Sequence, residues 1–240
     1  MLAAMPDCER ISEGLLAQPT NAVSSLVFLL AGAWVVGQAR RSRAHRRELL
    51  VFGAAIASNA VGGLLYHGDL DPATRAVHDV AIVAVLAFIA VFDVARLTDR
   101  GWPWTWRAFA ASLGLLAAAI VVLPGAQYVV FGVVGAVIVG AEIADYVRER
   151  PKLRGIAKRR LARLGAVLSL GLAATAFFVG RSGAPLCRPE SAMQWHAIWH
   201  ALAAVTMALY AYSAVEEHPP GPGVAPTAAP SPPAPSPRPV

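Results

Sequence analysis

The stretch "MQWHAIWHAL" at residues 193–202 carries two histidines four positions apart in a largely apolar run. Side chains four residues apart lie on the same face of a helix. An ionisable side chain inside a membrane helix is costly, and it usually faces a partner or a cavity within the bundle. His196 and His200 therefore predict a membrane-spanning helix that turns one polar face toward an internal site.

The rest of the chain has the composition of an integral membrane protein. Of its 240 residues, 56% are hydrophobic and only 15% are charged, whereas soluble domains carry about 25% charged residues. A helix needs roughly 20 apolar residues to cross a bilayer. Seven such runs predict an all-α bundle of seven transmembrane helices, at residues 20–37, 49–66, 73–95, 105–123, 127–147, 161–180 and 194–214.

One boundary between these runs has two interpretations. The sequence "VVLPGAQYVV" at residues 121–130 is either a short turn between the fourth and fifth helices or a kink in one longer helix. Outside the helical domain of residues 20–215, the sequence predicts an amino-terminal segment over residues 1–19. It also predicts a disordered, proline-rich tail over residues 216–240.

Arginine and lysine predict which side of the membrane each loop faces. Basic residues concentrate in the loops that follow the first, third and fifth predicted helices, such as "QARRSRAHRRE" at residues 38–48. Loops rich in arginine and lysine stay in the cytoplasm. We therefore expect the amino terminus outside and the carboxyl terminus in the cytoplasm of a multi-pass protein of the bacterial inner membrane. The net charge of +6 is explained by topology, without a nucleic-acid partner.

The two cysteines fall on the same side of the membrane in this topology. Cys8 belongs to the amino-terminal segment, and Cys187 belongs to the loop before the last helix. Both lie on the non-cytoplasmic side, where disulfides form and persist. A disulfide is the favoured interpretation, and two separate free thiols are the alternative.

Histidines on two other helices are expected at the depth of the first pair. His67 ends the second predicted helix at its outer side. The third helix begins with Asp71, a favourable N-cap, and Pro72, a favourable first residue. This start places His78 and Asp79 about two turns in from the outer face. Four of the six histidines thus reach one membrane level from three helices.

This convergence predicts a zinc site. His196 and His200 give two imidazoles on one helix face, and a third histidine from a neighbouring helix completes the arrangement that holds a catalytic zinc ion and leaves one position open for water. Asp79 is expected to face this group as a general base or as support for a ligand. A b-type haem is the weaker alternative, because His196 and His200 on one helix face cannot be opposite axial ligands.

Other polar residues in the membrane have simpler explanations. Asp93, Glu142 and Asp145 lie toward the cytoplasmic ends of their helices, where nearby arginines are expected to pair with them. Asn21 and Ser24 at the start of the first helix are expected to hydrogen bond to neighbouring helices. Contact with the metal pocket is the alternative for these two residues.

Several motifs together resemble the alkaline ceramidase family and its bacterial relatives. They are "LLYHGDL" and "HDVAIV" near the second and third helices, "WHAIWHAL" in the last helix, and "CER" followed by "AQPTNAVSSLVFLLAG" at the front. The wider group of seven-helix metal hydrolases also contains the progestin and adiponectin receptors. The resemblance implies zinc held by His67, His196 and His200, Asp79 at the family's aspartate, and a disulfide that joins Cys8 to Cys187.

The chain departs from the family pattern at Gly63, where a serine usually stands one turn before the first zinc histidine. Asn59, Ser24, Ser25 or an ordered water are the alternatives for supplying that hydroxyl. Serine is slightly more favourable than glycine inside a helix. We therefore expect serine at Gly63 to be tolerated by the fold and to raise turnover.

A second departure concerns calcium, which eukaryotic ceramidases bind through acidic residues at the front of the chain. Glu9 matches this pattern, but Gln18 stands where an acid is expected, so calcium is doubtful. The sequence therefore predicts a zinc-dependent intramembrane hydrolase that cleaves the amide of an N-acyl lipid such as ceramide. The alternative is a zinc-binding, receptor-like membrane protein without catalytic activity.

Overall fold

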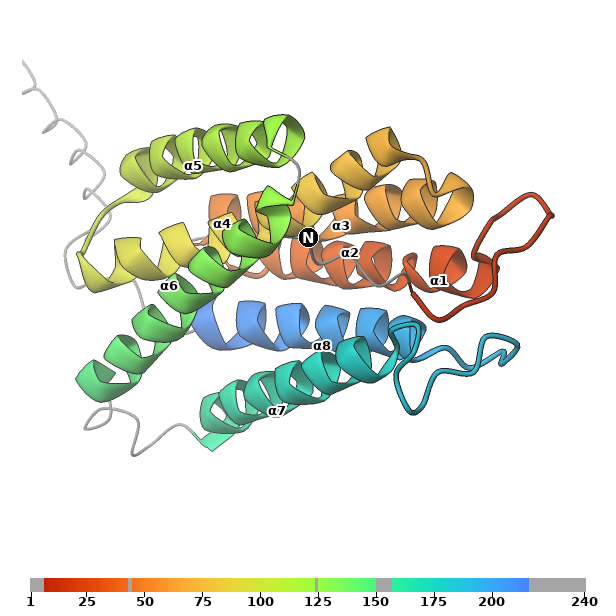
Figure 1. Cartoon of the computed structure of the whole chain (residues 1–240). Helices are drawn as coiled ribbons and strands as arrows, with labels where there is room; N and C mark the ends of the chain where they lie inside the picture. The colour runs from red at the N-terminus through yellow and green to blue at the C-terminus, as the bar shows by residue number, and fades with distance from the viewer. Residues whose placement is uncertain (1–6, 43–44, 124, 150–156, 216–240) are drawn as a thin grey trace, which may run out of the picture.

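The computed structural model describes residues 7–42, 45–123, 125–149 and 157–215. Within these ranges the chain forms eight helices (Figure 1): α1 (Pro19–Ser24), α2 (Val27–Ala39), α3 (Arg46–Asp69), α4 (Pro72–Leu97), α5 (Trp102–Val122), α6 (Ala126–Glu149), α7 (Ala157–Val179) and α8 (Trp195–Val215). The described ranges contain no strand, only an isolated bridge between Asp7 and Arg181. The predicted disordered tail of residues 216–240 lies outside the described residues.

Seven spans in the described ranges are long and apolar enough to cross a membrane: Pro19–Ala39, Arg46–Asp69, Pro72–Leu97, Trp102–Val122, Ala126–Arg148, Leu161–Val179 and Trp195–Ala214. Large apolar side chains are exposed on the outer faces of these spans. Leu115, for example, is 73% exposed and Leu30 is 71% exposed. Exposure of this kind suits helices surrounded by lipid. The all-α fold with seven candidate spans is therefore confirmed.

The sequence "VVLPGAQYVV" forms a turn and not a kink. Helix α5 ends at Val122 and α6 begins at Ala126. Gly125 has a positive φ of 83°, a conformation that glycine adopts without steric cost. The fourth and fifth spans are therefore separate helices.

The first span differs from the continuous helix that we predicted, because it is divided into α1 and α2. The hydroxyls of Ser24 and Ser25 both donate to the carbonyl of Asn21, at 3.0 and 2.9 Å. The amides of Leu26 and Phe28 bond to carbonyls three residues back, as in a 3₁₀ turn. Hydroxyls that bond to the backbone compete with the regular helical ladder. The predicted first span is confirmed as Pro19–Ala39, with this tight turn inside it.

Aromatic side chains from three helices fill the centre of the bundle. Phe88 on α4 stacks on Phe52 of α3 with ring centroids 5.0 Å apart. It also meets Phe109 of α5 edge-on at 5.5 Å. Helices α3 and α4 therefore lie at the middle of the molecule, and α5 packs against α4.

Small residues allow the helices that carry histidines to approach closely. A Cβ atom on Gly62 of α3 would lie 2.9 Å from the Cα of His78 on α4. A Cβ atom on Gly180, just after α7, would lie 3.0 Å from the backbone nitrogen of His196 on α8. Contacts between small residues and backbone are a common way for membrane helices to pack. These two contacts bring the end of α3 next to the start of α4, and the end of α7 next to the start of α8.

A separate group of charged residues joins the other ends of the helices. Arg96 and Arg163 each contact a carboxylate oxygen of Asp145 at 2.6 Å. The hydroxyl of Tyr210 donates to Asp93 at 2.6 Å, and Arg96 lies 3.5 Å from the same carboxylate. The prediction that Asp93 and Asp145 pair with arginines is confirmed. These buried charges are therefore explained by ion pairs and hydrogen bonds between helices.

Candidate metal centre

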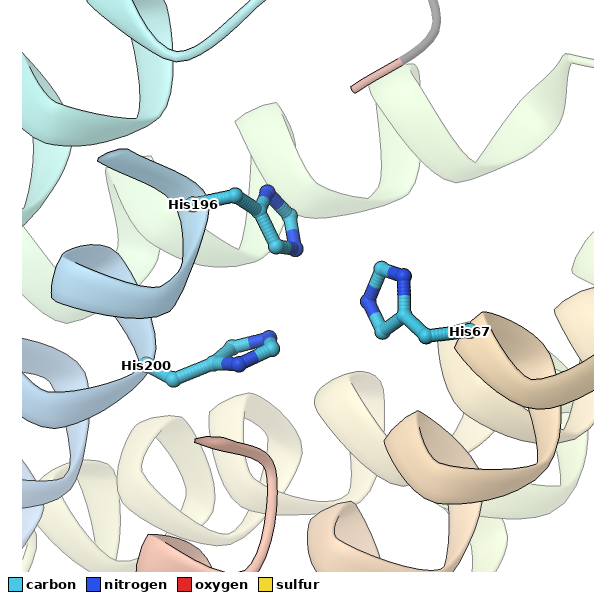
Figure 2. A group of neighbouring side chains, drawn as sticks. All are labelled: His67, His196 and His200. Carbon is cyan, nitrogen blue, oxygen red and sulfur yellow. The ribbon is translucent and has the colours of Figure 1, made fainter. Parts of the chain in front are cut away.

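Three buried histidines converge at the end of the bundle where α3 ends and α8 begins. His67 lies in the last turn of α3, whereas His196 and His200 lie in the first two turns of α8. Their rings point toward one another across a shared space (Figure 2). One ring nitrogen from each histidine lies within 4.8 Å of the corresponding nitrogens of the other two. The three residues are only 0%, 4% and 1% exposed, so the sequence prediction that they lie together agrees with the structure.

Gln18 determines which nitrogen of His67 faces this space. The side-chain oxygen of Gln18 lies 2.8 Å from Nδ1 of His67, and its amide nitrogen donates to the backbone carbonyl of Glu9 at 3.3 Å. The amide orientation follows from this pair of contacts. Because the Gln18 oxygen can only accept, the hydrogen of the neutral His67 ring lies on Nδ1. The lone pair is then on Nε2.

Ser24 has the same effect on His200. The Oγ of Ser24 lies 2.8 Å from Nδ1 of His200. The Ser24 hydroxyl hydrogen is already donated to the carbonyl of Asn21 at 3.0 Å. The serine oxygen therefore accepts from Nδ1 of His200, which leaves the lone pair on Nε2. Of the two interpretations for Ser24, contact with the histidine cluster is the one that the structure supports.

Asp7 lies against the third histidine. One of its carboxylate oxygens, Oδ1, is 3.1 Å from Nδ1 of His196 and 2.8 Å from a guanidinium nitrogen of Arg181. The other oxygen is 3.9 Å from Nδ1 of His67. Burial by itself would raise the pKa of Asp7, but His196, His67 and Arg181 hold that pKa well below its usual range. Asp7 is therefore an ionised carboxylate beside two of the three histidines.

The nitrogens that face the shared space have the character of metal ligands. The Nε2 atoms of His67 and His196 are buried and have no hydrogen-bond partner among the described residues. A buried polar atom without a partner is rare and needs an explanation. Neutral imidazole nitrogens are ordinary zinc ligands, and three of them are a common catalytic set. The residues present therefore fit a zinc ion.

A disulfide holds the amino-terminal segment next to this cluster. Cys8 and Cys187 are bonded with their Cα atoms 5.5 Å apart, which confirms the predicted pairing. The backbone amide of Cys8 also donates to the carbonyl of Gly180 at 3.0 Å. Both contacts connect the front of the chain to the segment between α7 and α8. Asp7, the neighbour of Cys8, is thereby held beside His196.

Asp79 lies on α4 next to the cluster. Its carboxylate oxygens are 3.3 Å from Nδ1 of His78 and 3.8 Å from Nε of Arg75. The ring of His78 meets the ring of His67 edge-on, with centroids 5.7 Å apart. Asp79 therefore reaches the cluster through His78. Its role in proton transfer stays a prediction.

Ser25 occupies the space beside Gly63. A Cβ atom on Gly63 would lie 2.3 Å from Oγ of Ser25 and 2.8 Å from its Cβ. Ser25 is fully buried, and its hydroxyl donates to the carbonyl of Asn21 at 2.9 Å. Of the alternatives for the missing family hydroxyl, Ser25 is the one that lies against Gly63. The expectation that serine at Gly63 would be tolerated is wrong, because Ser25, the residue after α1, already fills the space.

We predict that Gly63→Ser lowers the free energy of unfolding by about 1–3 kcal/mol, the usual cost of overpacking a filled core. Rotation of the Ser25 hydroxyl does not relieve the clash, since the Ser25 Cβ is itself too close. The double variant Gly63→Ser/Ser25→Gly should recover most of the loss. Thermal unfolding in detergent measures both variants. A single variant as stable as the wild type would contradict this account of the packing.

The two residues that the resemblance connects with calcium have other contacts here. Both carboxylate oxygens of Glu9 accept backbone hydrogens at the start of α1, from Thr20 at 2.7 Å and from Asn21 at 2.8 Å. The side chain of Gln18 is used by His67. Sequence reasoning missed the role of Gln18, because that role depends on how the residue before α1 meets the end of α3.

The comparison of this sequence with known protein families covers the whole helical domain. The sequence matches the family model described as Ceramidase over residues 8–218. The chain belongs to the ceramidase family. Membership supports a ceramide-hydrolysing membrane protein, and it implies an amide hydrolase with a lipid substrate. The match includes His67, Asp79, His196 and His200, whereas Asp7 precedes it. A search of curated proteins returns no match to this chain.

Proposed function

We propose that this ceramidase-family chain is a zinc-dependent intramembrane hydrolase that cleaves the amide bond of ceramide or a similar N-acyl lipid. One observation carries the proposal. Three buried histidines converge within a bundle of membrane-spanning length, and each has its Nδ1 beside an acceptor on the amino-terminal part of the chain. Such an arrangement presents three Nε2 lone pairs to one point.

The side chains have distinct roles in this proposal. His67, His196 and His200 hold the metal. A bound zinc ion would supply a Lewis acid that activates water and polarises the amide carbonyl. Asp79 accepts a proton during attack and returns it to the nitrogen of the leaving amine. The contact between His78 and Asp79 supports this role, since it places the carboxylate next to a ring that touches His67.

Asn21 has the properties of a group that binds the substrate carbonyl. Its side chain is fully buried, and in the part of the chain that the structure describes neither its amide nitrogen nor its oxygen has a hydrogen-bond partner. It lies in α1 between Gln18, the residue that caps the helix, and Ser24, and both of these residues contact zinc-ligand candidates. An amide N–H aimed at a carbonyl stabilises the charge that develops on that oxygen.

The position of the cluster suits a lipid substrate. The histidines lie at the ends of α3 and α8, and in the orientation expected from the arginine-rich loops these ends face the non-cytoplasmic side. The amide of an N-acyl lipid lies near the level of the headgroups. Such a lipid therefore presents its amide at the depth of the histidines.

Lipid mass spectrometry tests the proposal. Purified protein in lipid nanodiscs is incubated with ceramides of several chain lengths and with other N-acyl lipids, with and without a zinc chelator. We expect free fatty acid and free amine in equal amounts from at least one lipid, and no release after chelation. If the protein holds zinc but cleaves none of these lipids, the non-catalytic zinc-binding alternative replaces the proposal.

A further inference from the structure

We propose that Asp7 is a positioning residue for the metal centre, which fixes the ring of His196 with its Nε2 directed at the metal. The inference rests on the proposed zinc site. It assigns a role to a residue that lies outside the part of the chain matched by the family model. Asp7 would act through His196 and would not touch the metal itself.

The contacts around Asp7 are those of a carboxylate built into the protein. Its side chain is only 5% exposed, and it lies between His196 on α8 and Arg181 after α7. The hydroxyl of Ser182 also donates to its backbone carbonyl at 3.1 Å. Arg181 stacks over the ring of Phe177 at 4.2 Å. Asp7 is therefore held from several directions, and its carboxylate has a defined position.

The chemistry of this contact determines the tautomer of His196. A carboxylate oxygen 3.1 Å from Nδ1 would repel a lone pair on that nitrogen, so the neutral ring carries its hydrogen there. The lone pair is then on Nε2. Neither ring nitrogen of His196 has another hydrogen-bond partner among the described residues, so the Asp7 carboxylate is the group that distinguishes Nδ1 from Nε2. A carboxylate behind a metal-bound histidine also raises the basicity of the ligand. Gln18 and Ser24 do this for the other two histidines as neutral acceptors, so Asp7 is the acceptor that carries charge.

The disulfide makes this contact dependent on the fold of the amino-terminal segment. Asp7 immediately precedes Cys8, and the bond to Cys187 fixes the segment against the start of α8. The bridge between Asp7 and Arg181 aligns the backbone at the same place. A segment outside the membrane helices thus supplies part of the surroundings of the metal.

Zinc affinity of Asp7→Asn tests the proposal directly. Competition with a chelator of known affinity should show zinc binding weaker by about 10–100-fold than in the wild type, the usual effect of losing such a partner. The visible spectrum of the cobalt-substituted protein should change as well, because the ring of His196 loses the charged acceptor that raises its basicity. Glu13→Gln is the matched control, since it removes one exposed carboxylate from the same segment and should alter neither quantity.

The outcomes separate this inference from the proposed function. A wild-type protein without zinc would end the proposed function itself. Wild-type zinc affinity and an unchanged cobalt spectrum in Asp7→Asn would overturn the role of Asp7 alone. A purely structural role would lower the unfolding temperature and leave the spectrum of the folded protein unchanged.

A measurement on the wild-type protein covers the case in which Asp7→Asn does not fold. Nitrogen-15 NMR of histidine-labelled, zinc-loaded protein reports which ring nitrogen carries the hydrogen. The signals of the His196 ring are identified as those that are missing from the spectrum of the His196→Gln variant. The proposal requires the hydrogen of His196 on Nδ1, and a hydrogen on Nε2 would overturn it.

Discussion

Replacement of His200 by alanine is expected to remove zinc from the purified protein, from about one ion per chain to nearly none. His200 supplies one of three nitrogens that converge within 4.8 Å, and its side chain is almost completely buried. Two remaining imidazoles make a weak site, because a zinc ion held by the protein normally has at least three protein ligands. Amide hydrolysis should fall to the background rate with the metal. Elemental analysis and fatty-acid release measure the two effects.

Two controls keep this experiment interpretable. His45→Ala removes a histidine from the loop before α3, outside the cluster, and should retain the zinc of the wild type. An intact Cys8–Cys187 disulfide in His200→Ala, judged by gel mobility with and without reductant, shows that the end of the bundle next to the cluster still folds. Full zinc content in His200→Ala would place the metal elsewhere.

Replacement of Asp79 by asparagine should lower turnover by about 100-fold or more while the protein keeps its zinc. Asparagine has nearly the same shape, but it cannot accept a proton and return it to the leaving amine. The change removes the charge that lies 3.8 Å from Arg75 and keeps an oxygen that can face His78. Turnover number and zinc content are measured on the same preparation, so that loss of metal is not mistaken for loss of proton transfer.

Asp69→Asn is the matched control for this variant. Asp69 is an exposed carboxylate two residues after His67, and it accepts from nearby groups, the hydroxyl of Thr74 at 2.6 Å and the amide of Asp71 at 2.9 Å. It should keep wild-type turnover. If Asp79→Asn also hydrolyses at the wild-type rate, another group carries the proton and the proposed mechanism is wrong.

Much of the fold was predictable because membrane helices obey local rules. The length and apolar content of each run predicted seven spans, and the described part of the chain contains seven helices long and apolar enough to cross a membrane. Asp71 and Pro72 predicted the start of α4, where the Asp71 side chain accepts from the amide of Ala73 at 2.7 Å. Spacing of four placed His196 and His200 on one face. Each of these features depends on residues close together in the chain.

The sequence did not predict how the first span packs. Its apolar run was long enough for one continuous helix, yet Ser24 and Ser25 bond to the carbonyl of Asn21 and divide it. The Ser25 side chain, at this division, lies against Gly63. It occupies the space that the Cβ atom of a larger residue at position 63 would take. No periodicity within either helix contains this information, because it depends on how closely α1 and α3 approach.

The sequence by itself therefore determined the class of the protein, the number of its spans and the three histidines most suited to a shared metal. Tertiary structure alone decided the partners of those histidines, because Gln18, Ser24 and Asp7 are distant from them along the chain and meet them only after the helices pack. Hydrophobic pattern acts along one helix, over a few residues. The direction of a ring nitrogen depends instead on an acceptor within about 3 Å, which only the folded chain can place.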